Sequence, residues 1–273
     1  MSEARPAPVG VIVCGAAGRM GRLLVALARE DARLRVVGAI EAPGHPALGR
    51  DAGEIAGGGA LGVPIGAELA PVCRRETVVL DFTTPAATLA HARVAAERGA
   101  GLVIGTTGLD PAQDRELRTL AGSTRAVIAP NMSVGVTVLS ELVASAARLL
   151  DASFEPEIVE LHHHAKKDAP SGTALALGRA VAGARRQEFE RARVLAREGL
   201  VGARRPEEIG IVGLRAGDAV GDHTVVFGGL GERLELTHRA QSRDCLARGA
   251  LRAALWVADR PSGIYTMRDV LGL

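Results

Sequence analysis

The sequence predicts an α/β protein with an N-terminal Rossmann-like, doubly wound parallel sheet and a C-terminal α+β domain whose sheet is mixed and mostly antiparallel. Three observations predict this fold class. Aliphatic runs alternate with helical patterns through the first half of the 273 residues, and this rhythm changes near Asn131. In addition, 47% of the residues are hydrophobic but only 2% are aromatic. A core of Ala, Val, Leu and Ile suits helices packed on parallel strands, which are aliphatic along their whole length.

The first half repeats a strand followed by a helix. The expected strands are short buried runs, at residues 9–14, 34–40, 77–82, 101–104 and 125–129. Leucines at helical spacing mark a helix after the first run, and Pro85 and Pro111 stand where a proline can open a helix. Such βαβ repeats form a doubly wound sheet with right-handed crossovers. A glycine-rich stretch at 53–62 is expected to be a mobile loop.

The second half lacks this regular alternation. It contains a long helical pattern, a strand, a second helix that starts at Ser171, and three later strands, at 135–150, 157–161, 171 onward, 209–214, 223–227 and 233–237. A glycine-rich, hairpin-like turn joins the last two strands. We therefore expect an α+β domain over 133–243, and a final helix over 243–260 that returns to the first domain.

Composition excludes several classes of protein. The net charge is +2 and no basic stripe is present, so we expect no nucleic-acid partner. No apolar run approaches the roughly 20 residues of a membrane span. Three widely spaced cysteines suggest reduced thiols and a cytoplasmic location, with no metal site. Residues 1–8 lack the apolar stretch of a signal peptide and are expected to be a frayed tail.

A glycine-rich turn directly follows the first strand and opens the first helix. It reads Gly15-Ala16-Ala17-Gly18-Arg19-Met20-Gly21. Glycine lets the backbone turn tightly and approach a pyrophosphate, and the helix N-terminus offers free N–H groups to the phosphates. The spacing is GxxGxxG rather than GxGxxG, so a plain strand–helix turn is the alternative. The strand–turn–helix context favours a nucleotide site.

Two further positions extend this site. Glu41 ends the second strand, where a carboxylate can accept hydrogen bonds from the adenosine ribose and repel a 2′-phosphate. Its neighbour Ala42 offers no cation, so NADH is the preferred cofactor, although Arg19 leaves NADPH possible. Gly105-Thr106-Thr107-Gly108 ends the fourth strand run and is placed to line the nicotinamide, with a plain βα turn as the alternative.

The residues expected to carry the chemistry are concentrated between Glu160 and Thr173. This run contains three consecutive histidines and two lysines before a helix start at Ser171-Gly172-Thr173. Strand alternation would place His162 and His164 on one side and His163 on the other. Histidine exchanges protons near neutral pH, lysine can hold an anion or donate a proton, and the helix start can receive a carboxylate.

Three other interpretations of this run are possible. A zinc site would use His162 and His164, but no ligand spacing for zinc is present. A Ser171 nucleophile would need a positioned base, and no GxSxG elbow is found. A polar strand end with a capping serine would explain one histidine, but it does not explain the whole cluster beside a nucleotide fold.

Six stretches together carry a resemblance to a known family. They are residues 15–21, 105–108, 130–136, 160–174, 221–224 and 231–238. With them the chain resembles, over essentially its whole length, the 4-hydroxy-tetrahydrodipicolinate reductases of bacterial lysine biosynthesis, also called dihydrodipicolinate reductases. The resemblance implies a homotetramer that reduces a cyclic, unsaturated dicarboxylate to tetrahydrodipicolinate with NADH or NADPH. It implies a dinucleotide-binding domain over 1–132, completed by 244–273, and a substrate-binding and oligomerisation domain over 133–243.

Residue roles follow by motif from the same resemblance. His162 matches the general acid/base and Lys166 the proton-donating lysine. Substrate contacts are His163, Gly172 and Thr173, with Ser171 at the helix start and Arg243 near the active-site cleft. Cofactor contacts are Gly15, Ala16, Ala17, Gly18, Arg19, Met20, Glu41, Gly105, Thr106, Thr107, Ala129, Pro130, Asn131 and Met132.

Two departures from the family pattern affect these expectations. Many members carry arginine where this chain has Ala42, which again favours NADH. The pair His164-Ala165 replaces a commoner basic pair, so His164 is expected to be peripheral. A related reductase of another imine or oxo acid is the alternative function, and a non-catalytic NAD-sensing protein is a second one. The latter is disfavoured because a sensor needs no proton donor.

Overall fold

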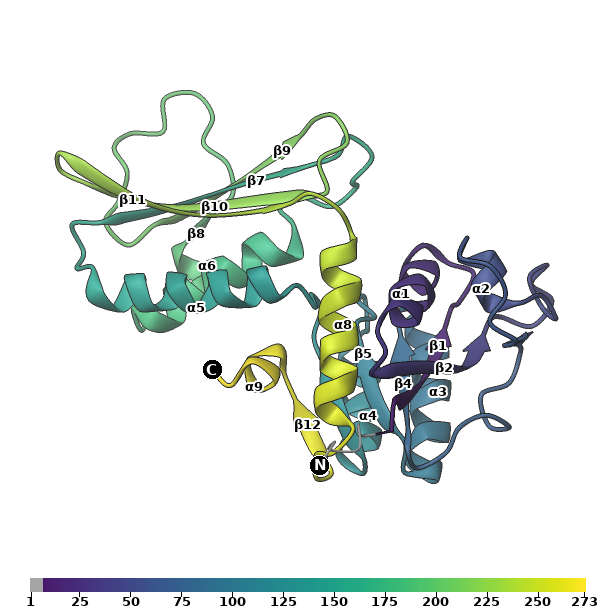
Figure 1. The fold of residues 1–273 in the computed structure, drawn as a ribbon. Coiled ribbons are helices and arrows are strands. Elements are labelled where there is room, and N and C mark those ends of the chain that lie inside the picture. The colour runs from purple at the N-terminus through teal and green to yellow at the C-terminus, as the bar shows by residue number, and fades with distance from the viewer. Residues whose placement is uncertain (1–6) are drawn as a thin grey trace, which may run out of the picture. The chain divides into compact units, whose positions relative to one another are not determined.

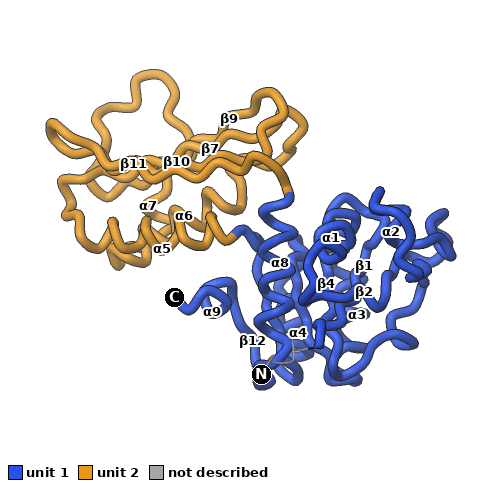
Figure 2. Tube along the Cα trace, in the orientation of Figure 1, with its two compact units in different colours: residues 1–133, 244–273 blue, residues 134–243 orange. Residues whose placement is uncertain are grey.

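The computed structural model describes residues 7–273 and divides into two compact units. Residues 1–133 and 244–273 form the first unit, and residues 134–243 form the second (Figure 2). Most of the expected frayed tail at 1–8 lies outside the described residues. No helix in the described part of the chain is long and apolar enough to cross a membrane.

The first unit is built on a seven-stranded sheet in the order β12-β6-β5-β4-β1-β2-β3, and every pairing in it is parallel. Its strands are β1 (Val9–Cys14), β2 (Leu34–Ile40), β3 (Ile65–Gly66), β4 (Thr77–Asp81), β5 (Gly101–Ile104), β6 (Arg125–Ile128) and β12 (Gly263–Tyr265). The chain runs outward from β1 through β3 and then restarts at β4 on the other side. The switch point therefore lies between β1 and β4, and the crevice beyond their carboxyl ends is where ligands bind in such sheets.

Helices cover both faces of this sheet. They are α1 (Arg19–Glu30), α3 (Pro85–Arg98), α4 (Pro111–Gly122) and α8 (Asp244–Val257) (Figure 1). The short helix α2 (Ala52–Ile55) packs on α1, and the short helix α9 (Met267–Leu271) packs on α8 and β12. Ile12 and Cys14 of β1 lie in a core cluster with α3 and α4, whereas the alternate residues Val11 and Val13 point to the opposite face. Helix α8 packs on β1, β4, β5, β6 and α1. The helix expected over 243–260 corresponds to α8, and in the structure it packs on this sheet.

Two segments of this unit differ from the sequence prediction. The chain end adds β12 and α9, which no periodicity predicted because each is shorter than two helical turns or four strand residues. The two ends of the glycine-rich stretch at 53–62 are held together by the Asp51 carboxylate. That carboxylate accepts hydrogen bonds from the backbone N–H groups of Gly53, Glu54, Leu61, Gly62 and Val63. The stretch therefore begins with the short helix α2 rather than with irregular chain.

The second unit is a five-stranded mixed sheet in the order β11-β10-β7-β9-β8, with helices packed on it. Its elements are α5 (Val134–Leu149), β7 (Glu155–His162), α6 (Gly172–Ala184), α7 (Phe189–Ala192), β8 (Arg193–Val194), β9 (Ile209–Arg215), β10 (Gly221–Gly229) and β11 (Glu232–Ala240). Strand β10 pairs antiparallel with both β11 and β7. Strand β9 pairs parallel with both β7 and β8. This confirms the predicted fold class.

One face of the second sheet is buried and the other is not. Ile158, Val225 and Phe227 are fully buried and pack with residues of α5 and α6. Alternate residues point the other way, and Val159 and Val212 are 37% and 41% exposed on that outer face. The candidate catalytic residues of this unit lie where β7 ends.

Candidate active site

The glycine-rich turn of the first unit has the geometry that a phosphate site requires. Gly15 has φ +71°, a left-handed conformation that glycine adopts without strain. A Cβ on Gly21 would lie 2.0 Å from the carbonyl oxygen of Gly15, so only glycine lets α1 seat this closely on the turn. Gly18 caps α1 without a side-chain hydrogen bond, and no acid lies in the first helical turn. The helix N-terminus can therefore receive an anion.

Glu41 is held in place beside this turn. Its Oε2 accepts a hydrogen bond from the backbone N–H of Ala17 at 3.0 Å, and its Oε1 accepts one from Ala42 N–H at 3.0 Å. The carboxylate forms one side of a largely apolar pocket of about 530 Å³. Other residues around the pocket include Gly15, Ile40, Pro43, Leu69, Thr83, Ala87 and His91. A pocket of this size and polarity suits a nucleoside.

Sequence reasoning missed the pocket residues that come from α3 and the end of β4. Thr83, Ala87 and His91 follow the third long strand of the chain. The sequence gives one indication of their role, namely that they follow β4, which borders the switch point of the sheet.

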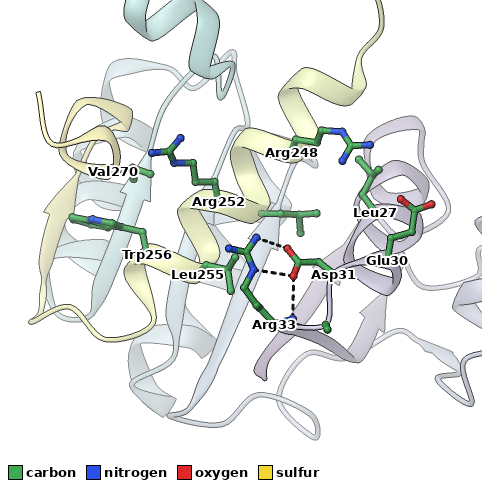
Figure 3. A pocket seen from close by; sticks show the side chains of 11 residues that line it. Leu27, Glu30, Asp31, Arg33, Arg248, Arg252, Leu255, Trp256 and Val270 are labelled. Carbon is green, nitrogen blue, oxygen red and sulfur yellow. Dashed lines mark hydrogen bonds and ion pairs between the residues drawn. The ribbon is translucent and has the colours of Figure 1, made fainter. Parts of the chain in front are cut away.

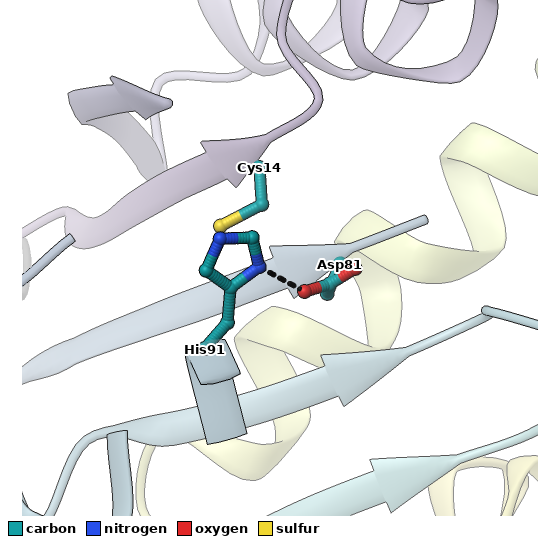
Figure 4. Close-up of side chains that lie close together, drawn as sticks. All are labelled: Cys14, Asp81 and His91. Atoms are coloured by element: carbon teal, nitrogen blue, oxygen red, sulfur yellow. Dashed lines mark hydrogen bonds and ion pairs between the residues drawn. The ribbon is translucent and has the colours of Figure 1, made fainter. Parts of the chain in front are cut away.

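A buried cluster adjoins the pocket through His91, which is one of the pocket residues (Figure 4). Asp81 is fully buried at the end of β4, and its Oδ2 lies 2.6 Å from His91 Nδ1. Its Oδ1 accepts hydrogen bonds from Thr83 and Thr88. Burial by itself raises the pKa of Asp81, but the hydrogen bonds from His91 and Thr83 outweigh burial and lower this pKa. Asp81 thus stays ionised and fixes the His91 ring.

Cys14 completes this cluster on the side of His91 away from Asp81 (Figure 4). Burial, followed by the charge of Asp81, raises the pKa of the Cys14 thiol well above its ordinary value. Ligand atoms of Cys14, Asp81 and His91 all lie within 4.8 Å of one another. The bond to Asp81 takes up Nδ1 of His91, and the ring nitrogen Nε2 is not part of that bond. We interpret the cluster as a hydrogen-bonded support of the pocket.

The remaining expected cofactor residues end neighbouring strands of the same sheet. Gly105, Thr106 and Thr107 follow β5, and residues 129–132 follow β6. Thr106 is buried, and its Oγ1 accepts a hydrogen bond from Thr88 Oγ1 at 2.8 Å. Because all these strands are parallel, their carboxyl ends form one edge. The fold therefore brings the predicted residues of the first unit to that edge.

A second hollow in this unit lies elsewhere. It has a volume of about 950 Å³ and lies along α1 and α8, between residues that include Leu27, Arg33, Arg248, Arg252 and Trp256 (Figure 3). Arg33 forms an ion pair with Asp31 at its rim. The hollow adjoins the C-terminal end of α1, whereas the glycine-rich turn opens the N-terminal end. We assign it no part in the site.

In the second unit, His162 is the last residue of β7 and is held by a buried carboxylate. Its Nδ1 lies 2.5 Å from Oε2 of Glu160, whose side chain is 0% exposed. The guanidinium of Arg215, at the end of β9, donates to both oxygens of Glu160 at 2.8 and 2.9 Å. Burial raises the pKa of Glu160, but the bonds from Arg215, His162 and Ser171 outweigh it and lower this pKa.

The chain leaves the strand directly after His162. The expected alternation of His162, His163 and His164 across a sheet is therefore wrong, because β7 ends too early. The backbone N–H groups of His163 and His164 donate to the carbonyls of Ala219 and Gly217 in the loop before β10. His164 Nδ1 lies 2.9 Å from the Gly217 carbonyl, away from Glu160. The side chains of His162 and His164 thus have different partners, Glu160 and the Gly217 carbonyl, which disfavours a zinc ion shared by these two histidines.

Lys166 and Arg243 lie in the surroundings of His163. Burial, followed by the charges of Arg243, His162, His164 and Lys166, lowers the pKa of His163. Lys166 Nζ contacts both carboxylate oxygens of Asp168 at 2.9 Å. The structure therefore brings together five cationic or titratable side chains that the sequence placed up to 81 residues apart, from position 162 to position 243.

Ser171 acts as the N-cap of α6. Its Oγ accepts a hydrogen bond from the backbone N–H of Ala174 at 3.1 Å and lies 2.9 Å from His223 Nε2. Gly172 and Thr173 form the first helical turn. This capping role, in a chain without a nucleophile elbow, disfavours a Ser171 nucleophile. Glu160 begins the run that the sequence analysis singled out, but its contact with His162 was not predicted. The contacts of Arg215 with Glu160 and of His223 with Ser171 were not predicted either.

Comparison with known proteins agrees with this geometry. Sequence models of the two halves of dihydrodipicolinate reductase match residues 9–132 and 135–271. The chain is 51% identical over 265 residues to the 4-hydroxy-tetrahydrodipicolinate reductase of Syntrophobacter fumaroxidans, covering 97% of this chain and 99% of the relative. It is 49% identical over 263 residues to that of Geobacter sulfurreducens, covering 96% and 98%.

Solved structures show the same fold. Dipicolinate-bound dihydrodipicolinate reductase from Paenisporosarcina sp. TG-14 superposes with a TM-score of 0.72, at 22% identity, over 95% of this chain and 97% of that chain. An amine dehydrogenase from Mycobacterium smegmatis superposes less closely, with a TM-score of 0.58 at 16% identity, over 98% and 96%. Since the sequence models cover both units, the chain belongs to the dihydrodipicolinate reductase family.

Proposed function

We propose that this chain is an NAD(P)H-dependent 4-hydroxy-tetrahydrodipicolinate reductase of the diaminopimelate and lysine pathway. The observation that carries this function is the close likeness to curated reductases across both units. The substrate is a cyclic, unsaturated dicarboxylate, and the product is tetrahydrodipicolinate. This reaction needs a nucleotide site, a carboxylate site and a proton donor, and the chain has candidates for each.

The nicotinamide cofactor belongs to the carboxyl edge of the first sheet. The pocket beside Glu41 fits an adenosine, and the uncapped N-terminus of α1 fits a pyrophosphate. The proposed contacts are Gly15 to Met20, Glu41, Gly105 to Thr107 and Ala129 to Met132, with Thr83 and His91 added from the pocket. When bound, the cofactor supplies a hydride. NADH is the proposed preference, because Glu41 repels a 2′-phosphate and Ala42 offers no compensating cation.

The dicarboxylate belongs to the second unit. The N–H groups at the start of α6, with Ser171, Gly172 and Thr173, can hold one carboxylate, and His163 and Arg243 add positive or polar groups. Hydride addition to the conjugated ring leaves negative charge on the substrate, which must gain a proton. His162 is the proposed general acid/base and Lys166 the proposed proton donor, and both stabilise charge where it develops.

A homotetramer formed through the second sheet is part of the proposal. The outer face of this sheet presents Val159, Val212 and Leu214, which are 37% to 48% exposed. Contiguous apolar surface of this kind is typical of an interface between proteins. We also propose a cytoplasmic location, because Cys14, Cys73 and Cys245 are free thiols.

The function can be tested with the purified protein and the condensation product of pyruvate and aspartate semialdehyde. We expect NADH oxidation that depends on this substrate. His162→Gln and Lys166→Ala should lower kcat much more than they weaken NADH binding, because neither residue belongs to the nucleotide site. A protein that binds NADH but oxidises it with neither this substrate nor related imines would contradict the proposal and support a sensing role.

A further inference from the structure

We propose that Glu160 and Arg215 are positioning residues for proton transfer. Glu160 fixes His162 in the tautomer that leaves Nε2 free to exchange a proton with the substrate. Arg215 holds the Glu160 carboxylate and ties it to the loop that carries Lys166. The inference rests on the proposed function, to which it adds residues that do not touch the substrate.

The first step is the assignment of the hydrogen between His162 and Glu160. An ionised carboxylate can only accept hydrogen bonds. Glu160 receives bonds from Arg215 and from the backbone N–H of Ser171 at 3.0 Å, all of which favour the ionised form. The contact of 2.5 Å with His162 Nδ1 therefore requires Nδ1 to carry the hydrogen. In the neutral ring, Nε2 then has the free lone pair.

The second step concerns the position of the ring. Glu160 is 0% exposed and lies two residues before His162 on the same strand, so the strand itself sets the distance between them. The strand pairing places His162 opposite Arg215 on β9 and Glu160 opposite His223 on β10. The carboxylate itself is held by His162 on its own strand, by Arg215 on β9 and by the backbone N–H of Ser171 at the start of α6. In many enzymes a buried carboxylate orients a catalytic histidine in this way and fixes its tautomer.

The third step links this pair to Lys166. One Arg215 nitrogen, Nη2, donates both to Oε1 of Glu160 at 2.9 Å and to the carbonyl of Asp168 at 2.5 Å. The carboxylate of Asp168 holds Lys166 Nζ at 2.9 Å. One guanidinium therefore positions both proposed proton-transfer residues. A lysine at position 215 could keep the charge but not the planar fork that makes these contacts together.

Several charged and titratable groups surround His162. They are Glu160 on β7, Arg215 on β9, His223 on β10, and His163 and Lys166 in the loop that follows. Glu160 is the only one of these that carries negative charge, so its removal disfavours a protonated His162 ring. The alkaline limb of the pH profile should therefore move to lower pH when Glu160 is neutralised.

The test compares Glu160→Gln with Glu157→Gln in the full-length enzyme. Glu157 also lies on β7, and both oxygens of its carboxylate accept hydrogen bonds from a guanidinium, that of Arg197, at 2.8 and 2.9 Å. Its other side-chain partner is Arg204, so in the described part of the chain it is bound by arginines and not by a histidine. For Glu160→Gln we expect kcat to fall by about 10²-fold or more, and the alkaline limb of kcat/KM to move by about one pH unit or more to lower pH. NADH affinity should stay within about twofold, and Arg215→Lys should lose roughly tenfold in kcat. Glu157→Gln should leave the pH profile unchanged.

A purely structural role for Glu160 gives a different result. It predicts that both variants lose stability and that neither shifts the pH profile, and this outcome would overturn the proposal. A second readout does not depend on turnover: 15N NMR of histidine-labelled wild-type enzyme should show His162 protonated at Nδ1 in its neutral form. A hydrogen on Nε2 would also overturn the proposal. If the wild type lacks turnover while the Nδ1 tautomer is present, the proposed function fails and the positioning role of Glu160 stands.

Discussion

The imidazole of His223 is buried against Ser171, with Nε2 2.9 Å from the serine Oγ. Its ring also meets the ring of His162 edge-on, with centroids 5.2 Å apart. Burial, followed by the charge of His162, lowers the pKa of His223 from its ordinary 6.5 to about 4. The folded protein therefore holds this residue neutral at a pH where an unfolded chain would protonate it.

The first prediction concerns stability in mild acid. Between pH of about 6.5 and about 4 the unfolded state binds a proton at His223 that the folded state does not bind. The free energy of unfolding must therefore fall as pH drops through this range, by up to about 3 kcal/mol from this group, and level off below it. Urea unfolding followed by circular dichroism should show a flatter pH dependence for His223→Gln than for the wild type. Parallel curves would contradict the assignment.

The second prediction concerns the space beside His162. A Cβ on Gly221 would lie 2.9 Å from His162 Nε2. Gly221→Ala should therefore displace the ring and lower kcat by about 10-fold or more, because small misplacements of catalytic groups are costly. Stability should change little, since only a side-chain end must move. The control is Gly228→Ala on the same strand, where the nearest atom to a new Cβ is 3.9 Å away. Equal activity in the two variants would refute this.

The third prediction concerns the choice of cofactor. Glu41 is held by the backbone N–H groups of Ala17 and Ala42, so its side chain is fixed beside the proposed ribose site. Ala42→Arg should raise kcat/KM for NADPH relative to NADH by about 10-fold or more, because an arginine can pair with the 2′-phosphate. Ala42→Gln adds length without charge and should have a much smaller effect. A wild type that strongly prefers NADPH would contradict the proposal.

The fourth prediction concerns the buried support of the nucleotide pocket. Asp81→Asn removes the charge that holds His91 and replaces one buried acceptor oxygen with an NH2 donor, so one of the groups around it loses its acceptor. We expect a loss of about 2–4 kcal/mol in the free energy of unfolding. The sole tryptophan, Trp256, lies in this unit and can report its unfolding by fluorescence. Asp114→Asn, which breaks the exposed pair with Arg118 on α4, should cost less than about 0.5 kcal/mol. Similar losses in both variants would show that the buried contacts of Asp81 stabilise the protein no more than the exposed ion pair of Asp114 does.

The fifth prediction concerns assembly. Val212→Glu places a charge on the outer face of the second sheet and should dissociate the proposed tetramer into smaller species. Leu149→Glu introduces the same charge at the exposed end of α5, where the side chain is 85% exposed, and should leave the assembly unchanged. Sedimentation velocity measures both. A monomeric wild type would rule out the tetramer.

The fold class followed from the sequence because its signals are local. Aliphatic runs marked β1, β2 and β5 to the residue, and the prolines at positions 85 and 111 marked where α3 and α4 begin. Ser171 was recognised as a helix start for the same reason, since its side chain bonds only three residues ahead. Short elements such as β12 have no periodicity to detect, and the sheet edge on which they pair supplies their stability instead.

The site was predictable only in part. The run from His162 to Thr173 and the glycine-rich turn could be recognised by sequence alone, and so could the position of Glu41 after its strand. Tertiary structure decided the partners of these residues. Arg215 lies 55 residues from Glu160, and His223 lies 52 residues from Ser171. Their contacts depend on the register of β7 against β9 and β10, where a shift of one residue would turn every side chain to the other face. That register is set by burial of the whole sheet face, and no local pattern contains it.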